Sequence, residues 1–187
     1  MRVSVQIKPS GPAPRTLPHI GLLLRLDRTL DCAKWFGLGP GEAYSDKKAA
    51  QRVGIWAAGG DELHTAYEVP QENGNRMGTR WLDARDRRGE GGVRVRLVRD
   101  DGVVDKNMDM DGKKGKSLLF QWQLSKYSAK MLEAAKHPCD LQEDEAMLLR
   151  LDVAMAGVGT GACGPAIGEA YEVRCEERVF EFALMPL

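Results

Sequence analysis

Apolar and polar residues alternate with a period of two along much of the chain. In GGVRVRLVRD, residues 91–100, the apolar residues Val93, Val95 and Leu97 fall on one face and two arginines on the other. Residues 117–125 and 178–187 alternate in the same way. This pattern is typical of antiparallel strands that bury one face. Further strands are predicted at residues 3–7, 20–26, 33–37, 146–154 and 170–175.

One segment has a convincing helical pattern. The string YSAKMLEAAKHP offers Ser128 as an N-cap, good helix formers up to Lys136, and Pro138 as a stop. We expect one short helix near residues 128–136, with a helical turn as a further option around residues 45–52. Many strands separated by turn signals favour an all-β fold, an antiparallel β-sandwich, over an α/β fold. No internal repeat or boundary is evident, so residues 1–187 are expected to form a single domain.

Two segments stand apart from this pattern. Residues 8–18 hold four prolines, KPSGPAPRTLP, and predict an extended connector. Residues 100–117 predict a charged, flexible loop that protrudes. Its string N-x-D-x-D-G, starting at Asn107, matches the first half of an EF-hand loop. The twelfth position of that loop needs a bidentate glutamate but holds Leu118, so we expect a solvated loop and no metal site.

Composition narrows the class of protein. Apolar residues make up 43% of the chain and charged residues 29%, as in an ordinary globular domain. The basic and acidic residues both number 27, so no net charge favours nucleic acid or an anionic membrane as a partner. No apolar run is long enough to cross a bilayer, and the first residues lack the core of a secretory signal. The four cysteines have no CxxC spacing, which predicts reduced thiols in a cytoplasmic protein.

Candidate catalytic groups are present but carry no recognisable motif. The histidines His19, His64 and His137 have no sequence neighbours that form a triad. Glu42 and Glu72 could form the acid and nucleophile of a glycosidase. Buried carboxylates that accept hydrogen bonds from turn N–H groups would have the same sequence. The residues by themselves leave these two alternatives open.

Five strings in order provide a more specific signal: HIGLLLRLD, KWFGLGPGEAYSDKKAAQRVG, YEVPQENGNRMGTRWL, LSKYSAKMLEAAKHPCDL and LRLDVAMAGVGTGACGPAI. This series closely resembles the C-terminal domain of family 2 β-galactosidases, which some bacteria encode as a separate small chain. The resemblance runs from about Pro18 to the C-terminus, except for residues 101–116. The form GVGTGACGP resembles fungal-type members. The resemblance implies a large antiparallel supersandwich related to galactose mutarotases.

The resemblance also implies that this chain starts partway into the family's domain. An incomplete sandwich of this kind would expose strand edges and an apolar face, and should associate with something that covers them. In the family, two glutamates on a preceding TIM barrel hydrolyse β-galactosides such as lactose with retention, and the barrel also holds magnesium. None of those motifs occurs here. We therefore expect no catalytic residue or cofactor in this chain, and a barrel-bearing partner, in the same or a separate chain, in an oligomeric enzyme that binds the galactoside.

Eight residues match structural motifs of the family, W-[YF]-G-x-G-P-x-E and P-x-E-N-G: Trp35, Gly37, Gly39, Pro40, Glu42, Glu72, Asn73 and Gly74. By this resemblance Glu72 belongs to a turn and is not a catalytic glutamate. Residues 71–75 would close a bend, in which Gly74 tolerates a positive φ and the asparagine side chains bind local backbone.

The loop GVGTGACGP, residues 157–165, is the segment that the resemblance brings closest to substrate. In many family members this loop carries a tryptophan that lines the sugar pocket, and Cys163 occupies the matching position here. With Gly161 and Ala162, Cys163 is therefore a candidate for substrate contact in an assembled enzyme; the alternative is a small buried thiol. The glycines of this loop fit a tight turn that crosses close to another surface.

Three other readings remain open. A stand-alone carbohydrate-binding module would bind a sugar saturably without a partner, although the low aromatic content disfavours it. A mutarotase-like sugar epimerase would need a histidine and a carboxylate that converge on a sugar. A gene fragment would have no separate function.

Overall fold

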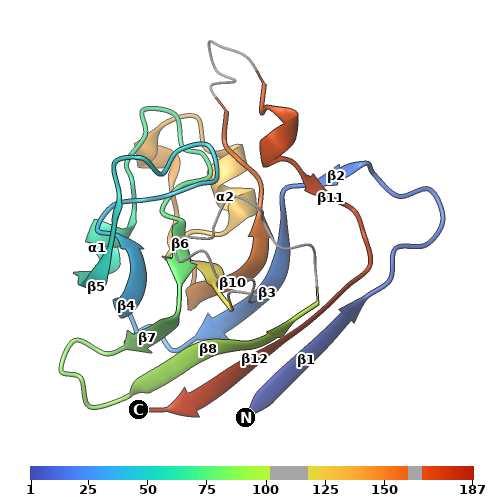
Figure 1. Ribbon diagram of the computed structural model, residues 1–187. Helices are drawn as coiled ribbons and strands as arrows, with labels where there is room; N and C mark the ends of the chain where they lie inside the picture. The colour runs from blue at the N-terminus through green and yellow to red at the C-terminus, as the bar shows by residue number, and fades with distance from the viewer. Residues whose placement is uncertain (102–117, 160–165) are drawn as a thin grey trace.

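The fold is an antiparallel β-sandwich, which confirms the predicted all-β class (Figure 1). The computed structural model describes residues 1–101, 118–159 and 166–187. The larger sheet has six strands in the order β1 (Arg2–Ile7), β12 (Arg178–Pro186), β8 (Gly92–Asp100), β7 (Trp81–Arg85), β4 (Cys32–Gly39) and β5 (Arg52–Gly59). The smaller sheet has four, in the order β3 (His19–Leu26), β10 (Met147–Met155), β9 (Phe120–Ser125) and β6 (Arg76–Thr79). A two-stranded sheet pairs β2 (Thr16–Leu17) with β11 (Val173–Arg174).

The core lies between the two main sheets and is built from alternate residues of their strands. Trp35 of β4 meets Trp122 of β9 edge to face, with ring centroids 5.2 Å apart. Phe120 meets Phe182 in the same way at 5.5 Å. Such edge-to-face pairs add to the stability that comes from burying the rings. The apolar residues of the period-two pattern therefore form the inner faces of the sandwich.

The predicted helix is confirmed but shorter. Helix α2 spans Ala129–Ala134, and the Ser128 hydroxyl accepts the Met131 N–H at 3.1 Å as an N-cap. The other short helices are α1 (Gly60–Leu63), η1 (Pro138–Asp140) and η2 (Glu169–Tyr171). None of the described helices is long and apolar enough to cross a membrane.

Several elements differ from the sequence-based prediction. Strands β5, β6 and β7 were not predicted, and residues 45–51 form turns, with a bridge between Tyr44 and Lys47, in place of the optional helical turn. The segment predicted as a strand at residues 170–175 is divided between η2 and β11. The proline-rich connector ends in β2. Most of the predicted charged loop, residues 102–117, lies outside the described residues.

Candidate functional site

Glu72 lies in the bend between α1 and β6, and both the backbone conformation and side-chain hydrogen bonds fix the shape of this bend. Gly74 has a φ of +74°, the left-handed value predicted for this bend, and a Cβ there would lie 2.5 Å from the Leu63 carbonyl oxygen. The Asn73 amide donates to the Gln71 carbonyl at 2.9 Å and accepts the Thr65 N–H at 3.1 Å. Local hydrogen bonds therefore fix the direction in which Glu72 points.

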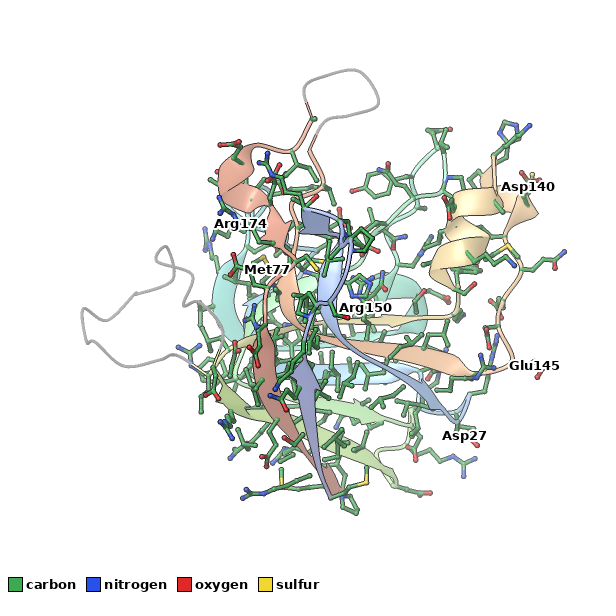
Figure 2. All side chains as sticks on the ribbon, turned by 90° about the vertical axis from the view of Figure 1, so that its right-hand side faces the viewer. Asp27, Met77, Asp140, Glu145, Arg150 and Arg174 are labelled. Carbon is green, nitrogen blue, oxygen red and sulfur yellow. The ribbon has the colours of Figure 1, made fainter. Side chains whose placement is uncertain are left out.

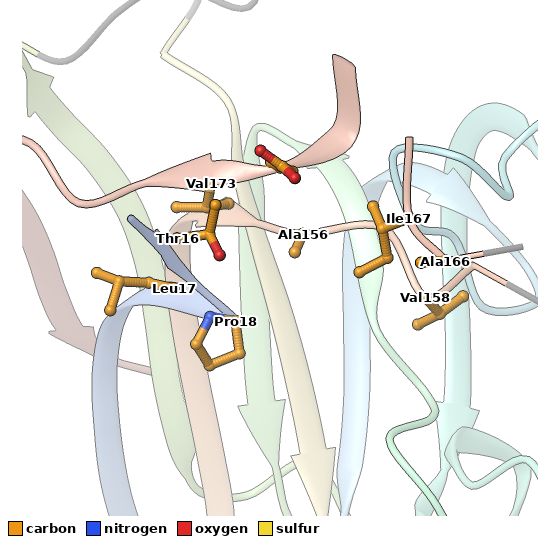
Figure 3. Close-up of a pocket in the computed structure, with 9 residues that line it drawn as sticks. Thr16, Leu17, Pro18, Ala156, Val158, Ala166, Ile167 and Val173 are labelled. Atoms are coloured by element: carbon orange, nitrogen blue, oxygen red, sulfur yellow. The ribbon is translucent and has the colours of Figure 1, made fainter. Parts of the chain in front are cut away.

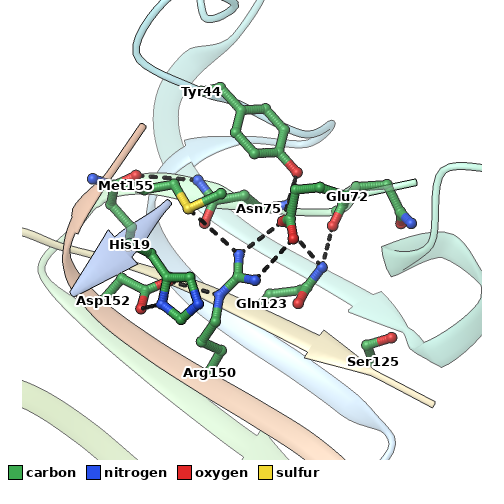
Figure 4. Close-up of polar contacts among 12 residues, drawn as sticks. His19, Tyr44, Glu72, Asn75, Gln123, Ser125, Arg150, Asp152 and Met155 are labelled. Atoms are coloured by element: carbon green, nitrogen blue, oxygen red, sulfur yellow. Dashed lines mark hydrogen bonds and ion pairs between the residues drawn. The ribbon is translucent and has the colours of Figure 1, made fainter. Parts of the chain in front are cut away.

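Glu72 points at Arg150, which lies 78 residues further along the chain (Figure 4). Two Arg150 nitrogens donate to the two Glu72 oxygens at 2.9 and 2.8 Å, and the Tyr44 hydroxyl donates to the same carboxylate at 3.0 Å. Arg150 alternates along β10 with the core residues Leu149 and Leu151, so it lies on the outward face of the smaller sheet. Figure 2 shows Arg150 near the middle of the molecule. A planar guanidinium suits this bidentate geometry.

The network continues from Arg150 to the next outward residue of β10. Arg150 donates to Asp152 at 2.7 Å, and the other Asp152 oxygen lies 3.0 Å from Nδ1 of His19. Asp152 is fully buried, whereas the His19 side chain is 37% exposed. Burial lowers the pKa of Arg150, but its hydrogen bonds to the Glu72 carboxylate and the charge of Asp152 raise that pKa more, above its ordinary value. Two carboxylates therefore enclose one guanidinium that stays charged.

Glu42 lies on the other side of the same bend. It is 7% exposed and accepts the Gly74 N–H at 2.8 Å, with further hydrogen bonds from the Lys47 ammonium and the Tyr67 hydroxyl. Burial raises the pKa of Glu42, but these hydrogen bonds lower it more, so the net pKa is below the ordinary value. Each of the two candidate glutamates is thus held by donors from this chain.

Asp46 holds the stem of the loop at residues 157–165. Its carboxylate accepts the N–H groups of Val158 at 3.1 Å and Gly159 at 2.7 Å. A Cβ at Gly157 would lie 2.5 Å from Cγ of Asp46, so the close approach predicted for this glycine is present. The candidate substrate-contact residues Gly161, Ala162 and Cys163 lie outside the described residues.

A pocket of about 450 Å³ lies beside this stem, between β2, β11 and the residues that follow β10 (Figure 3). Its wall is mostly aliphatic and includes Leu17, Pro18 and Ile167. The charged residue in the wall, Glu172, forms an ion pair with Arg15 at 3.0 Å. Sugar sites combine apolar surface with several convergent polar groups, and this wall offers few.

The remaining histidines stand apart from these groups. His64 packs edge to face against Tyr127 at 5.2 Å, and burial lowers the pKa of its imidazole. His137 lies at the start of η1, where its backbone N–H donates to Asp140 at 2.9 Å. Within residues 1–101, 118–159 and 166–187, no three His, Cys, Asp or Glu side chains converge as a metal site would need.

Comparison with known proteins assigns the chain to a family. The family model described as β-galactosidase small chain matches residues 1–184. The chain belongs to this family. It is 32% identical over 171 residues to a β-galactosidase of Kluyveromyces lactis, which is 91% of this chain and 14% of the relative. It is 32% identical over 175 residues to the β-galactosidase of Arthrobacter sp. (strain B7), covering 93% of this chain and 16% of that protein. This β-galactosidase small-chain domain thus spans a minor part of the relatives it matches.

The structure places the other motif residues of this β-galactosidase domain in or against its core. Trp35 is buried, and its indole N–H donates to the Leu38 carbonyl at 2.9 Å. A Cβ at Gly37 would lie 2.8 Å from Oγ1 of Thr79, and one at Gly39 would lie 2.6 Å from Cδ1 of Trp56. Both glycines thus allow close packing where a side chain would clash.

Pro40 connects this motif to the bend that holds Glu72. Its carbonyl accepts the Nε–H of Arg76 at 3.1 Å, and the Gly74 carbonyl accepts an N–H of the same guanidinium at 2.8 Å. Arg76 is 2% exposed, and burial lowers its pKa to about 10. The two family motifs are therefore joined through one buried arginine.

Sequence reasoning missed the residues that hold the candidate glutamates and the loop stem, among them Arg150, Asp152 and Asp46. Arg150 and Asp152 alternate with leucines, which identifies an outward face but names no partner. Asp46 follows the W-[YF]-G-x-G-P-x-E motif without any spacing that links it to residue 158. No local signal in the sequence could have found the contact of Arg150 with Glu72 or that of Asp46 with Val158, because these contacts join residues 78 and 112 positions apart.

Proposed function

We propose that this chain is a non-catalytic domain of a β-galactosidase, which hydrolyses terminal β-D-galactosides such as lactose. In this proposal the domain completes the rim of the active site and supports assembly, and the catalytic glutamates lie on a barrel-bearing partner. The observation that carries the proposal is the match itself. Nearly the whole chain aligns with proteins named β-galactosidase, yet it covers only 14–16% of the first three of them.

The geometry of the two candidate glutamates supports the non-catalytic role. A glycosidase needs one carboxyl group as an acid and another free to attack or to activate water. Glu72 is engaged by Arg150 and Tyr44, and Glu42 by Gly74, Lys47 and Tyr67. A carboxylate has about four lone-pair sites, and with three of them engaged by internal donors it is a weaker nucleophile.

The proposal keeps substrate contact at Gly161, Ala162 and Cys163, in the assembled enzyme only. Asp46 supports this assignment, because its carboxylate binds the N–H groups of Val158 and Gly159, the residues that lead into this segment. Magnesium would be held by the barrel-bearing part. The proposal also includes membership of a fungal-type subfamily, a mutarotase-like supersandwich in the complete domain, and an oligomeric enzyme. It further includes a cytoplasmic location, which the free thiols at Cys32, Cys139 and Cys175 support.

The test is hydrolysis of a chromogenic β-galactoside. The purified chain is assayed alone and mixed with the Kluyveromyces lactis β-galactosidase from which the matching segment has been removed. We expect turnover only in the mixture, and Cys163→Trp to change the KM there. Turnover by the chain alone would overturn the proposal, as would a folded chain that restores no activity.

The mutarotase-like alternative now meets a specific obstacle. His19 and Asp152 do lie 3.0 Å apart, but Asp152 is fully buried and its second oxygen is bound by Arg150. That carboxylate cannot reach a sugar. Binding of free galactose by the chain alone, measured by calorimetry, would instead favour a carbohydrate-binding module.

A further inference from the structure

The larger sheet carries apolar side chains on the face that points away from the core. We define the outer patch as Phe36 and Leu38 of β4, Val53 and Ile55 of β5, and Trp81 of β7. The strand register places Phe36 opposite both Ile55 and Trp81, and Leu38 opposite Val53, so the five side chains are neighbours. Ile55 is 62% exposed and Val53 42%, and none of the five belongs to the core cluster.

Two arginines cover the aromatic rings of the outer patch. The guanidinium of Arg80 lies 4.7 Å from the ring centroid of Phe36, and that of Arg94 lies 5.0 Å from that of Trp81. These cation–π contacts occupy ring faces that a sugar would otherwise stack on. The patch is therefore better suited to a protein surface than to a saccharide.

The rim of the outer patch is basic although the whole chain has no net charge. In the strand register, Asp83 of β7 stands opposite Lys34 of β4 on one side and opposite Arg94 of β8 on the other. Asp83 is 4% exposed and is already bound by Arg94 at 2.6 and 2.8 Å. Among the residues that the structure describes, Lys34, Arg80 and Arg96 take part in no ion pair. The rim thus presents unneutralised cations around an apolar centre.

These features indicate what covers the outer patch. Apolar patches with a polar rim mark interaction sites, and aromatic residues and arginine are enriched in interface centres. The relatives of this chain are several times longer, so their matching domain belongs to a much larger polypeptide. We propose that the outer patch docks the barrel-bearing part of the β-galactosidase, through an apolar surface rimmed by carboxylates. This inference rests on the proposed function and adds the face that makes the contact.

The test compares two matched substitutions. Ile55→Glu places a carboxylate in the outer patch, and Leu23→Glu places one on β3 of the smaller sheet, where the replaced leucine is 64% exposed. Binding of the chain to the Kluyveromyces lactis β-galactosidase lacking its matching segment is measured by calorimetry. We expect Ile55→Glu to weaken binding at least about tenfold and Leu23→Glu to leave it unchanged. Added salt should weaken binding, and less steeply for Arg96→Glu.

A second measurement keeps the test decisive if the shortened enzyme folds poorly. The chain replaces the matching segment within the complete Kluyveromyces lactis enzyme, and thermal inactivation is followed. Ile55→Glu should inactivate at a lower temperature than Leu23→Glu, while both isolated chains unfold like the unaltered one.

The outcomes separate this inference from the proposed function. Suppose that the unaltered chain restores activity and that the Ile55→Glu variant binds as tightly as the unaltered chain. The assignment of the docking face is then wrong, and the proposed function stands. A chain that self-associates through Ile55 without binding the enzyme would show a surface between copies, which also overturns the inference. If the unaltered chain neither binds the shortened enzyme nor gives an active enzyme when it replaces the matching segment, both proposals are overturned.

Discussion

Replacing Glu72 by glutamine changes the charge at the centre of the polar network and almost nothing in shape. The amide keeps one oxygen for Tyr44 or Arg150, but its NH2 group faces guanidinium donors in place of accepting from them. Removing one partner of a fully buried ion pair costs about 3–5 kcal/mol. The Glu72 side chain is 29% exposed and Arg150 keeps Asp152, so we expect a loss of about 2 kcal/mol.

The assay is urea unfolding of the unaltered chain and of Glu72→Gln, with the midpoint and slope compared. A loss of this size would lower the melting temperature of a domain of this length by roughly 4–8 °C. Glu68→Gln is the matched control, because Glu68 is exposed in the same segment and none of the ion pairs among the described residues includes it. We expect that control to stay within about 0.5 kcal/mol.

Two results would refute this reasoning. If Glu72→Gln unfolds at the same urea concentration as Glu68→Gln, the ion pair with Arg150 contributes no net stability. If Glu72→Gln is as stable as the unaltered chain but abolishes turnover in the assembled enzyme, Glu72 acts in the chemistry and is not a structural residue.

Other predictions address the remaining parts of the site. Because its folded pKa is lowered, Glu42 contributes stability that is present above the ordinary glutamate pKa of about 4.3 and lost as the pH falls through the lower, folded pKa. Urea unfolding of Glu42→Gln across acidic pH should therefore show a flatter dependence; parallel curves would contradict this. Gly74→Ala should cost at least about 1–2 kcal/mol, because it combines a positive φ with a clash. Gly89→Ala, also at positive φ but with open space around it, should cost less in the same thermal melts. Asp46→Ala should speed hydrogen exchange at the Val158 amide more than Asp46→Asn does, and equal rates would exclude the anchor.

Strands could be predicted wherever one face is apolar and the other polar. The residues Val93, Val95 and Leu97 of β8 show this alternation, and the structure buries Val95 and Leu97. β5 was missed because both its faces are apolar or small: Trp56 and Ala58 pack toward the core, while Ile55 points outward. An outer face that is apolar gives no alternation of polar and apolar residues, and this alternation is the signal by which the other strands were predicted.

The sequence by itself determined the fold class, the helix that Ser128 caps, the left-handed glycine of the bend and, through its ordered motifs, the β-galactosidase family. It also identified Glu42 and Glu72 as candidate catalytic or structural carboxylates. Only the tertiary structure decided what those glutamates contact. Arg150 reaches Glu72 because the register of β10 in its sheet brings the arginine under a bend 78 residues away. Local propensities set the elements, but the pairing of buried charges depends on how distant elements pack, and that is decided when the sheets come together.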